Sequence, residues 1–173
     1  MTASGGYSGK LYRALNPRWA ADPLSGAGAA AYGGRFNPVG TPALYCSLSP
    51  LTALREANQV GDLQPTVLVG YRADIAVVFD SRDGAALHDR DMSAAMLADS
   101  GWRIAMRDEG SAPTQRFAQR LIAEGCAGLL VPSFARGATE VDFNLVLWRW
   151  GNRPPTRLEL IDDEDRLAQG LSQ

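Results

Sequence analysis

The passage from a strand into a helix is clearest in residues 43–56, which read ALYCSLSPLTALRE. The run 43–47 has the aromatic and apolar residues of a strand, and it follows a turn rich in proline and glycine. Ser49 is a good N-cap, and Pro50 suits the first helical position because no backbone N–H is needed there. We therefore predict a strand over 43–47 and a helix that begins at Pro50 and stops at Gly61.

Outward from this stretch, strands outnumber helices and do not alternate with them, which excludes a doubly wound sheet. A second helix should run from Ser111 and Pro113 to a glycine cap at Gly125. A third is expected over 91–98, with a loop around Trp102. The fold class is α+β, with mixed, largely antiparallel sheets and two or three flanking helices. The other strands are expected over residues 11–15, 66–72, 75–80, 128–131, 140–150 and 157–161.

The length of 173 residues predicts a single domain over 1–173, large enough to bury one core. The tail from Asp162 is acidic, and we expect it to be mobile. The N-terminus lacks the basic and then apolar pattern of a signal peptide, and no apolar run approaches 18 residues. These features predict a cytoplasmic protein without a membrane segment.

Almost all of the positive charge is arginine, since Lys10 is the only lysine among 17 basic residues. Arginine binds phosphate or carboxylate through two parallel hydrogen bonds. The net charge is nevertheless −2 and the isoelectric point about 5.4. This balance favours a discrete anionic ligand over a long polyanion such as nucleic acid.

The histidine and cysteine content restricts the chemistry further. His88 is the only histidine, and Cys46 and Cys126 are far apart in the sequence. We therefore expect no metal site. A Ser–His or Cys–His nucleophile is excluded unless His88 is the base, and its neighbours are typical of a loop or a helix start.

A glycine- and alanine-rich stretch over 23–37 contains the strongest candidate for ligand binding. Its glycines permit close backbone approach, and Arg35 follows two of them in Gly-Gly-Arg-Phe-Asn. Arg35 can grip a phosphate there, although a surface arginine in a turn is the alternative. The glycines match neither a Walker motif nor GxGxxG, so side chains must hold any phosphate, although the backbone at Gly34 can contribute.

Other candidates are weak one by one. A helical glutamate such as Glu56 is most often a solvated charge, and a strand tyrosine such as Tyr45 is usually half-buried structure. Ser47 ends the same strand as Tyr45. Ser133 closes the strand over 128–131, at the kind of position where site residues collect.

Taken together, these residues resemble the RES-domain toxins of bacterial toxin–antitoxin pairs. The arginine, glutamate and serine of that family correspond to Arg35, Glu56 and Ser133. The resemblance spans residues 10–161 and is specific within 11–56 but loose over 80–125. Its other motifs are Leu-Tyr-Arg at 11–13, Leu-Ser-Gly-Ala-Gly-Ala at 24–29 and Leu-Tyr-Cys-Ser at 44–47, and it departs at Phe36, where tryptophan is common.

The resemblance implies an ADP-ribosyltransferase-like fold and cleavage of the nicotinamide–ribose bond of NAD⁺, which is a substrate and not a cofactor. ADP-ribose would pass to a protein, to water or to phosphate. The implied catalytic residues are Arg35, Tyr45, Glu56 and Ser133. The residues implied in NAD⁺ binding are Arg13, Gly34, Arg35, Asn37, Tyr45 and Ser47.

The chemistry of these residues agrees with those roles. Arg13 and Arg35 suit the pyrophosphate, Tyr45 can stack on nicotinamide, and Glu56 can stabilise an oxocarbenium-like centre. Nicotinamide leaves as a neutral molecule, so no general acid is required. Ser47 and Ser133 can hydrogen-bond ribose or carboxamide, and Asn37 can do the same or brace Arg35.

The resemblance also implies a partner, a cognate antitoxin with a helix-turn-helix DNA-binding part. The chain itself would then bind neither nucleic acid nor membrane. Two other functions stay open at this point. A ribonuclease toxin would need an acid–base pair and a basic groove, and a non-catalytic nucleotide-binding module would have no need of Glu56.

Overall fold

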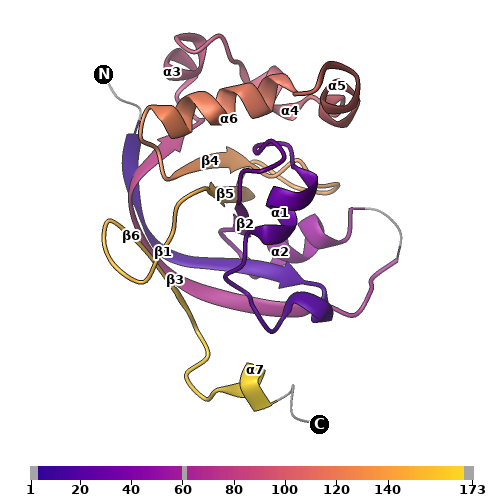
Figure 1. The fold of residues 1–173 in the computed structure, drawn as a ribbon, viewed down its shortest axis with the longest axis vertical. Coiled ribbons are helices and arrows are strands. Elements are labelled where there is room, and N and C mark those ends of the chain that lie inside the picture. The colour runs from indigo at the N-terminus through magenta and orange to yellow at the C-terminus, as the bar shows by residue number, and fades with distance from the viewer. Residues whose placement is uncertain (1–3, 60–61, 170–173) are drawn as a thin grey trace.

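Residues 4–59 and 62–169 are described by a computed structural model, in which the strands form one connected sheet (Figure 1). The strand order is β1-β2-β5-β4-β3-β6, and an additional pairing of β1 with β3 closes the first five strands into a ring. Among the described pairs, β3 with β4 is parallel and the others are antiparallel. The expected α+β class with a mixed, largely antiparallel sheet is confirmed. The strands are β1 (Ser4–Leu15), β2 (Leu44–Ser47), β3 (Val67–Asp80), β4 (Gly128–Pro132), β5 (Phe143–Leu147) and β6 (Thr156–Leu160).

The helices are shorter and more numerous than the two or three that the sequence predicts. Helices α3 to α6 gather at one end of the ring, near β4, while α1 and α2 lie beside β2 (Figure 1). None of the described helices has the length and apolar character needed to cross a membrane. They are the 3₁₀ helix η1 (Pro17–Trp19) and α1 (Ala27–Tyr32), α2 (Pro50–Ala57), α3 (Gly84–His88), α4 (Ala94–Ala98), α5 (Trp102–Glu109), α6 (Pro113–Ala123) and α7 (Arg166–Gln169).

Two helices confirm their sequence signals. The Ser49 hydroxyl accepts a hydrogen bond from the Thr52 N–H at 3.1 Å, which starts α2 as expected. Helix α2 ends at Ala57, earlier than predicted, and Gly61 lies outside the described residues. Helix α6 begins at Pro113, and Gly125 follows it with a positive φ of 96°.

The predicted bounds of the long strands differ most from the structure. Strand β1 begins at Ser4 and not at residue 11, because its serine- and glycine-rich first half is held by pairing with β3 along its length. The runs 66–72 and 75–80 are one strand, β3, which pairs with both β1 and β6 at Ala73 and Asp74. Strand β5 is shorter than 140–150, because the chain still turns at Asp142.

The segment 81–112 holds more helix than expected. The helix predicted over 91–98 is shortened to α4, since the Ser93 hydroxyl accepts the Met96 N–H at 3.2 Å and starts the helix there. Trp102 begins α5 and does not lie in a loop. His88 is exposed at the end of α3.

Two apolar clusters lie on opposite faces of the sheet. Successive side chains of a strand point to opposite faces. In β5, Leu145 and Leu147 belong to one cluster, whereas Val146, together with Trp148 just after the strand, belongs to the other. The first cluster includes Leu11, Tyr71 and Ile75 from β1 and β3. The second packs the sheet against α6 through Phe117 and Leu121. This second face continues into the candidate site.

Candidate active site

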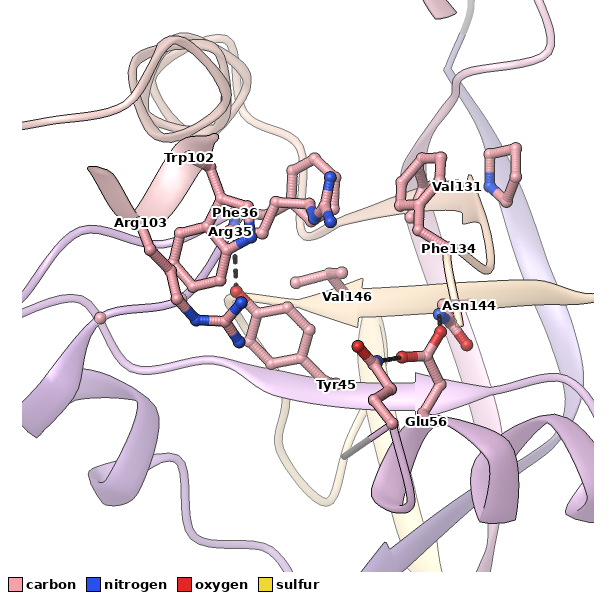
Figure 2. Close-up of a pocket in the computed structure, with 14 residues that line it drawn as sticks. Arg35, Phe36, Tyr45, Glu56, Trp102, Arg103, Val131, Phe134, Asn144 and Val146 are labelled. Carbon is pink, nitrogen blue, oxygen red and sulfur yellow. Dashed lines mark hydrogen bonds between the residues drawn. The ribbon is translucent and has the colours of Figure 1, made fainter. Parts of the chain in front are cut away.

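The floor of a pocket is formed by neighbouring side chains on one sheet face (Figure 2). Tyr45 of β2 lies opposite Val146 of β5, and Ser47 lies opposite Asn144. All four share a face because the residues alternate along each strand, and Tyr45, Val146 and Asn144 line the pocket while Ser47 lies just beyond it. The Ser47 hydroxyl donates to the Asn144 side-chain oxygen at 2.7 Å, which fixes the orientation of the Asn144 amide. The Asn144 amide nitrogen is thereby directed away from Ser47.

Glu56 projects from α2 to the edge of this floor and is not a solvated helix charge. Its Oε1 accepts hydrogen bonds from the Ser133 hydroxyl and from the Asn144 Nδ2, each at 2.5 Å. Its Oε2 accepts one from Gln59 at 2.5 Å. The glutamate and serine predicted from the sequence are therefore in direct contact, and Asn144 joins them.

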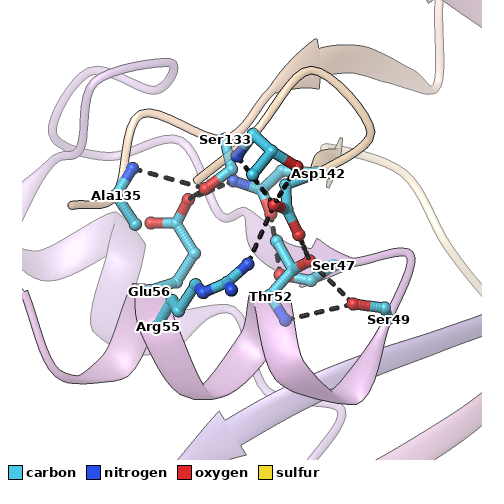
Figure 3. A network of polar contacts seen from close by, with 10 residues as sticks. Ser47, Ser49, Thr52, Arg55, Glu56, Ser133, Ala135 and Asp142 are labelled. Carbon is cyan, nitrogen blue, oxygen red and sulfur yellow. Dashed lines mark hydrogen bonds and ion pairs between the residues drawn. The ribbon is translucent and has the colours of Figure 1, made fainter. Parts of the chain in front are cut away.

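A second carboxylate holds α2 in the position that this contact requires (Figure 3). Asp142 is buried and accepts hydrogen bonds from Thr52 at 2.5 Å and Arg55 at 2.9 Å, both on α2. It also accepts the N–H and hydroxyl of Thr139 at 2.8 and 2.9 Å. Hydrogen bonds from Thr52 and Thr139 lower the pKa of Asp142 to about 2, and Arg55 acts in the same direction. The backbone carbonyl of Asp142 accepts the Ser133 N–H at 2.8 Å, so Asp142 links α2 to Ser133.

Arg35 lines the same pocket as Glu56. Its NH1 donates to the carbonyl oxygens of Leu97 and Asp99 at 2.8 and 2.9 Å, and its guanidinium stacks 4.7 Å from the centre of the Phe134 ring. Burial lowers the pKa of Arg35, while the nearby Glu56 carboxylate acts in the opposite direction. Within the described chain, Nε and NH2 of Arg35 make no hydrogen bond, which leaves that edge for an anion.

The loop that carries Arg35 is tied to Tyr45. The Tyr45 hydroxyl donates to Asn37 Oδ1 at 2.6 Å and accepts the Phe36 N–H at 3.0 Å. Burial raises the pKa of Tyr45. A Cβ at Gly34 would collide with the Tyr45 hydroxyl and lie 2.6 Å from Asn37 Oδ1, so this position requires glycine.

Asn37 is fully buried behind the pocket wall. Its Nδ2 donates to the carbonyls of Ala29 and Thr41 at 2.8 and 2.9 Å, and its Oδ1 is taken by Tyr45. Both ends of the amide are therefore occupied, and this geometry favours bracing of the loop over direct contact with a ligand.

Gln115 connects the same loop to α6. It is fully buried, and its Oε1 accepts the Ala112 N–H at 3.0 Å. Its Nε2 donates to the carbonyls of Gly34 and Asn37 at 2.9 and 3.2 Å. A polar side chain inside the core thus sets the distance between a helix and the Arg35 loop.

Arg13 and Ser47 lie beside this pocket and do not line it. Arg13 follows Leu11 on the same strand face and donates from NH1 to the Pro23 carbonyl at 2.9 Å. Both residues line a neighbouring pocket of about 270 Å³ that also reaches Glu56 and Asn144. Of the predicted residues, Gly34, Arg35, Tyr45 and Glu56 line the first pocket, whereas Ser133 reaches it through Glu56.

Sequence reasoning missed Asn144, Trp102 and Arg103. Trp102 and Arg103 enter the pocket from the start of α5, on the side opposite Glu56 in Figure 2. The sequence did not indicate either residue, because its pattern around Trp102 predicted a loop and not a helix. Asn144 was detectable in principle, as a polar residue in an otherwise apolar strand, Phe143–Leu147.

Comparisons with known proteins give a family and a fold. Residues 10–168 match the family model described as the RES domain, which confirms the resemblance drawn from the motifs. A chain of the "M. tuberculosis MbcT-MbcA toxin-antitoxin complex" is similar in structure, with a TM-score of 0.61 and 22% identity over 91% of this chain and 83% of that one. This likeness shows a common fold. None of the curated proteins matches.

Proposed function

This chain belongs to the RES domain family, and on that premise we propose that it is the toxin of a toxin–antitoxin pair and cleaves the nicotinamide–ribose bond of NAD⁺. The observation that carries the proposal is the carboxylate of Glu56, held at the pocket by Ser133 and Asn144. Cleavage produces positive charge at the ribose anomeric carbon, as in glycoside hydrolysis. A fixed carboxylate stabilises that charge without having to reorient during the reaction.

The reaction needs little else from the protein. When the C1′–N bond breaks, its electron pair goes to the nicotinamide nitrogen, and neutral nicotinamide leaves. An oxygen of the acceptor then donates a lone pair to C1′ and loses its proton to solvent. Glu56 Oε1 is occupied by two donors, whereas Oε2, among the residues that the structure describes, accepts a hydrogen bond only from Gln59. Gln59 is exposed, so its side chain can be displaced by a ribose hydroxyl.

The cations of the pocket suit the rest of the substrate. Arg35 has an unused guanidinium edge, and Arg103 is exposed in the same pocket with no hydrogen bond or ion pair among the described residues. Arginines in this arrangement suit a pyrophosphate. The Tyr45 ring, fixed by its buried hydroxyl, offers a flat surface for nicotinamide.

The product depends on the acceptor. Transfer to a protein gives an ADP-ribosylated protein, transfer to water gives free ADP-ribose, and transfer to phosphate gives ADP-ribose-1″-phosphate. A ribonuclease is disfavoured because His88 and Lys10 are both exposed and neither lines the pocket. A purely nucleotide-binding module would not require the hydrogen-bonded Glu56. The similar solved structure is a toxin–antitoxin complex, and we extend this to a cognate antitoxin whose helix-turn-helix part contacts DNA.

The test is mass spectrometry of NAD⁺ incubated with the protein, with and without phosphate and cell lysate. Release of nicotinamide is expected, and the three acceptors give three distinguishable products. Glu56→Gln should lower turnover about a hundred-fold or more, as loss of charge stabilisation in a transition state does, while leaving NAD⁺ affinity nearly unchanged. Glu159→Gln, an exposed glutamate on β6, is the matched control.

Intact NAD⁺ after prolonged incubation would overturn the proposal. Glu56→Gln with more than about a third of wild-type turnover would overturn the role of the carboxylate, since electrostatic stabilisation of this kind is worth far more.

A further inference from the structure

The pocket that contains Arg35 and Glu56 is small, at about 290 Å³. Pockets for small molecules range from about 300 to 1,000 Å³, so a volume at the lower limit leaves no room for a whole dinucleotide. If the nicotinamide ribose lies against Glu56, the adenosine half of the substrate must lie elsewhere.

A larger pocket of about 490 Å³ adjoins the first one, since Gly33 and Tyr45 line both. It lies between the end of β1, the 3₁₀ helix η1 and α1. Its wall includes Ala27, Gly28 and Ala29, from the glycine- and alanine-rich stretch of the sequence. The small side chains of these three residues leave the larger pocket open.

The other residues around the larger pocket suit a nucleoside phosphate. Trp19 is 65% exposed although it lines the pocket, and an exposed indole is a stacking surface for a base. Arg18 makes no side-chain hydrogen bond or ion pair among the described residues, so it can bind phosphate. Arg13 adds a second positive charge to the same wall, where it is held by the Pro23 carbonyl and the Tyr71 hydroxyl. Asp22 also lines the pocket, and its carboxylate can accept hydrogen bonds from ribose hydroxyls.

We propose that the pocket between η1 and α1 binds the adenosine monophosphate half of the dinucleotide, with adenine on Trp19. This inference rests on the proposed function, because it divides one substrate between two adjoining pockets. Tyr45 and Gly33 form the boundary between them. The nicotinamide ribose is then on the Glu56 side and the adenosine on the Trp19 side.

The test uses isothermal titration of the Glu56→Gln protein, which keeps NAD⁺ intact during the measurement, with NAD⁺, AMP and nicotinamide mononucleotide. Adding Trp19→Ala to this protein should lower its affinity for NAD⁺ and for AMP roughly ten- to a hundred-fold, as loss of a base–aromatic stack does. Affinity for nicotinamide mononucleotide should stay within about twofold, since it lacks the adenine that Trp19 would contact. Tyr32→Ala is the matched control, because Tyr32 is 79% exposed on α1 and does not line this pocket.

The outcomes separate the two proposals. Equal weakening of all three ligands, unchanged NAD⁺ and AMP affinities, or a parent protein that binds nicotinamide mononucleotide but not AMP would each overturn the adenosine site. In those cases nicotinamide release from NAD⁺ by the wild-type protein would still stand. A wild-type protein that neither binds nor cleaves NAD⁺ would instead overturn the proposed function itself. Because Trp19 is largely exposed, its replacement should not unfold the chain, and thermal melting checks this.

Discussion

The buried glutamine at position 115 offers a direct test of how the site is held. Replacing Gln115 by methionine keeps nearly the same volume but removes every hydrogen bond of the amide. The Ala112 N–H then loses its acceptor inside the core. The Asn37 carbonyl still accepts the Gly34 N–H at 2.8 Å, and the Gly34 carbonyl still accepts the Asn37 N–H at 3.4 Å, so both are less affected.

The expected loss of stability follows from that single orphaned donor. A buried donor without a partner costs about 1–3 kcal/mol, so we expect a loss of about 2 kcal/mol. In a chain of this size each kcal/mol lowers Tm by about 2–4 °C, which gives a fall of about 4–8 °C. The loop carrying Arg35 also loses its link to α6, and kcat/KM for NAD⁺ should fall about tenfold, in line with the cost of small misplacements.

Thermal unfolding and nicotinamide release measure the two effects on one preparation. Gln64→Met is the matched control, since Gln64 is exposed and its side chain donates, within the described part of the chain, only to the nearby Asp62 carbonyl at 3.3 Å. Its stability should change by less than about 0.5 kcal/mol. If Gln115→Met melts within about 2 °C of the wild-type protein, the orphaned donor is not as costly as argued.

Three further changes follow from the site. Gly34→Ala should lower Tm and should lower kcat/KM by more than about tenfold, because the new Cβ would collide with the Tyr45 hydroxyl. In the control Gly84→Ala the new Cβ has no atom within 4 Å, so Tm and kcat/KM should not change, and equal behaviour of the two variants would refute this reasoning. Arg103→Ala should raise KM for NAD⁺ about tenfold, as loss of a charge-assisted contact does, with Tm and kcat unchanged. Arg107→Ala, on the same helix but outside the pocket, should leave KM unchanged. An unchanged KM for Arg103→Ala would show that Arg103 does not bind the substrate. The pKa of Asp142 is lowered to about 2, so its stabilising effect is complete above its usual value of 3.8 and is lost as pH falls from there toward 2. The Tm difference between wild type and Asp142→Asn should therefore shrink over that range, and a constant difference would contradict the assigned pKa.

Local signals in the sequence identified the elements that begin or end with a special residue. Ser49 and Pro50 start α2, and Gly125 follows the end of α6, because caps act through adjacent backbone groups. The first half of β1 carries no such signal. Its glycines and serines form a strand only because β3 lies alongside, 60 or more residues later in the chain, and no local pattern encodes that pairing.

The candidate site shows the same division. Arg35, Tyr45 and Glu56 lie in recognisable motifs and share one pocket. Asn144 and Asp142 carry no motif, and their importance depends on β5 and its preceding turn lying against α2. Trp102 and Arg103 depend on how α5 packs at the end of the ring, which is a tertiary property.

The clamp on Arg35 has a consequence for how this site can be controlled. The carbonyls that hold its guanidinium belong to Leu97, in α4, and to Asp99, which follows that helix. The orientation of the arginine therefore depends on two residues that do not themselves line the pocket. A molecule that displaces the end of α4 would release the guanidinium of Arg35 from these carbonyls while leaving the pocket open. An inhibitor of this protein therefore need not compete with its substrate.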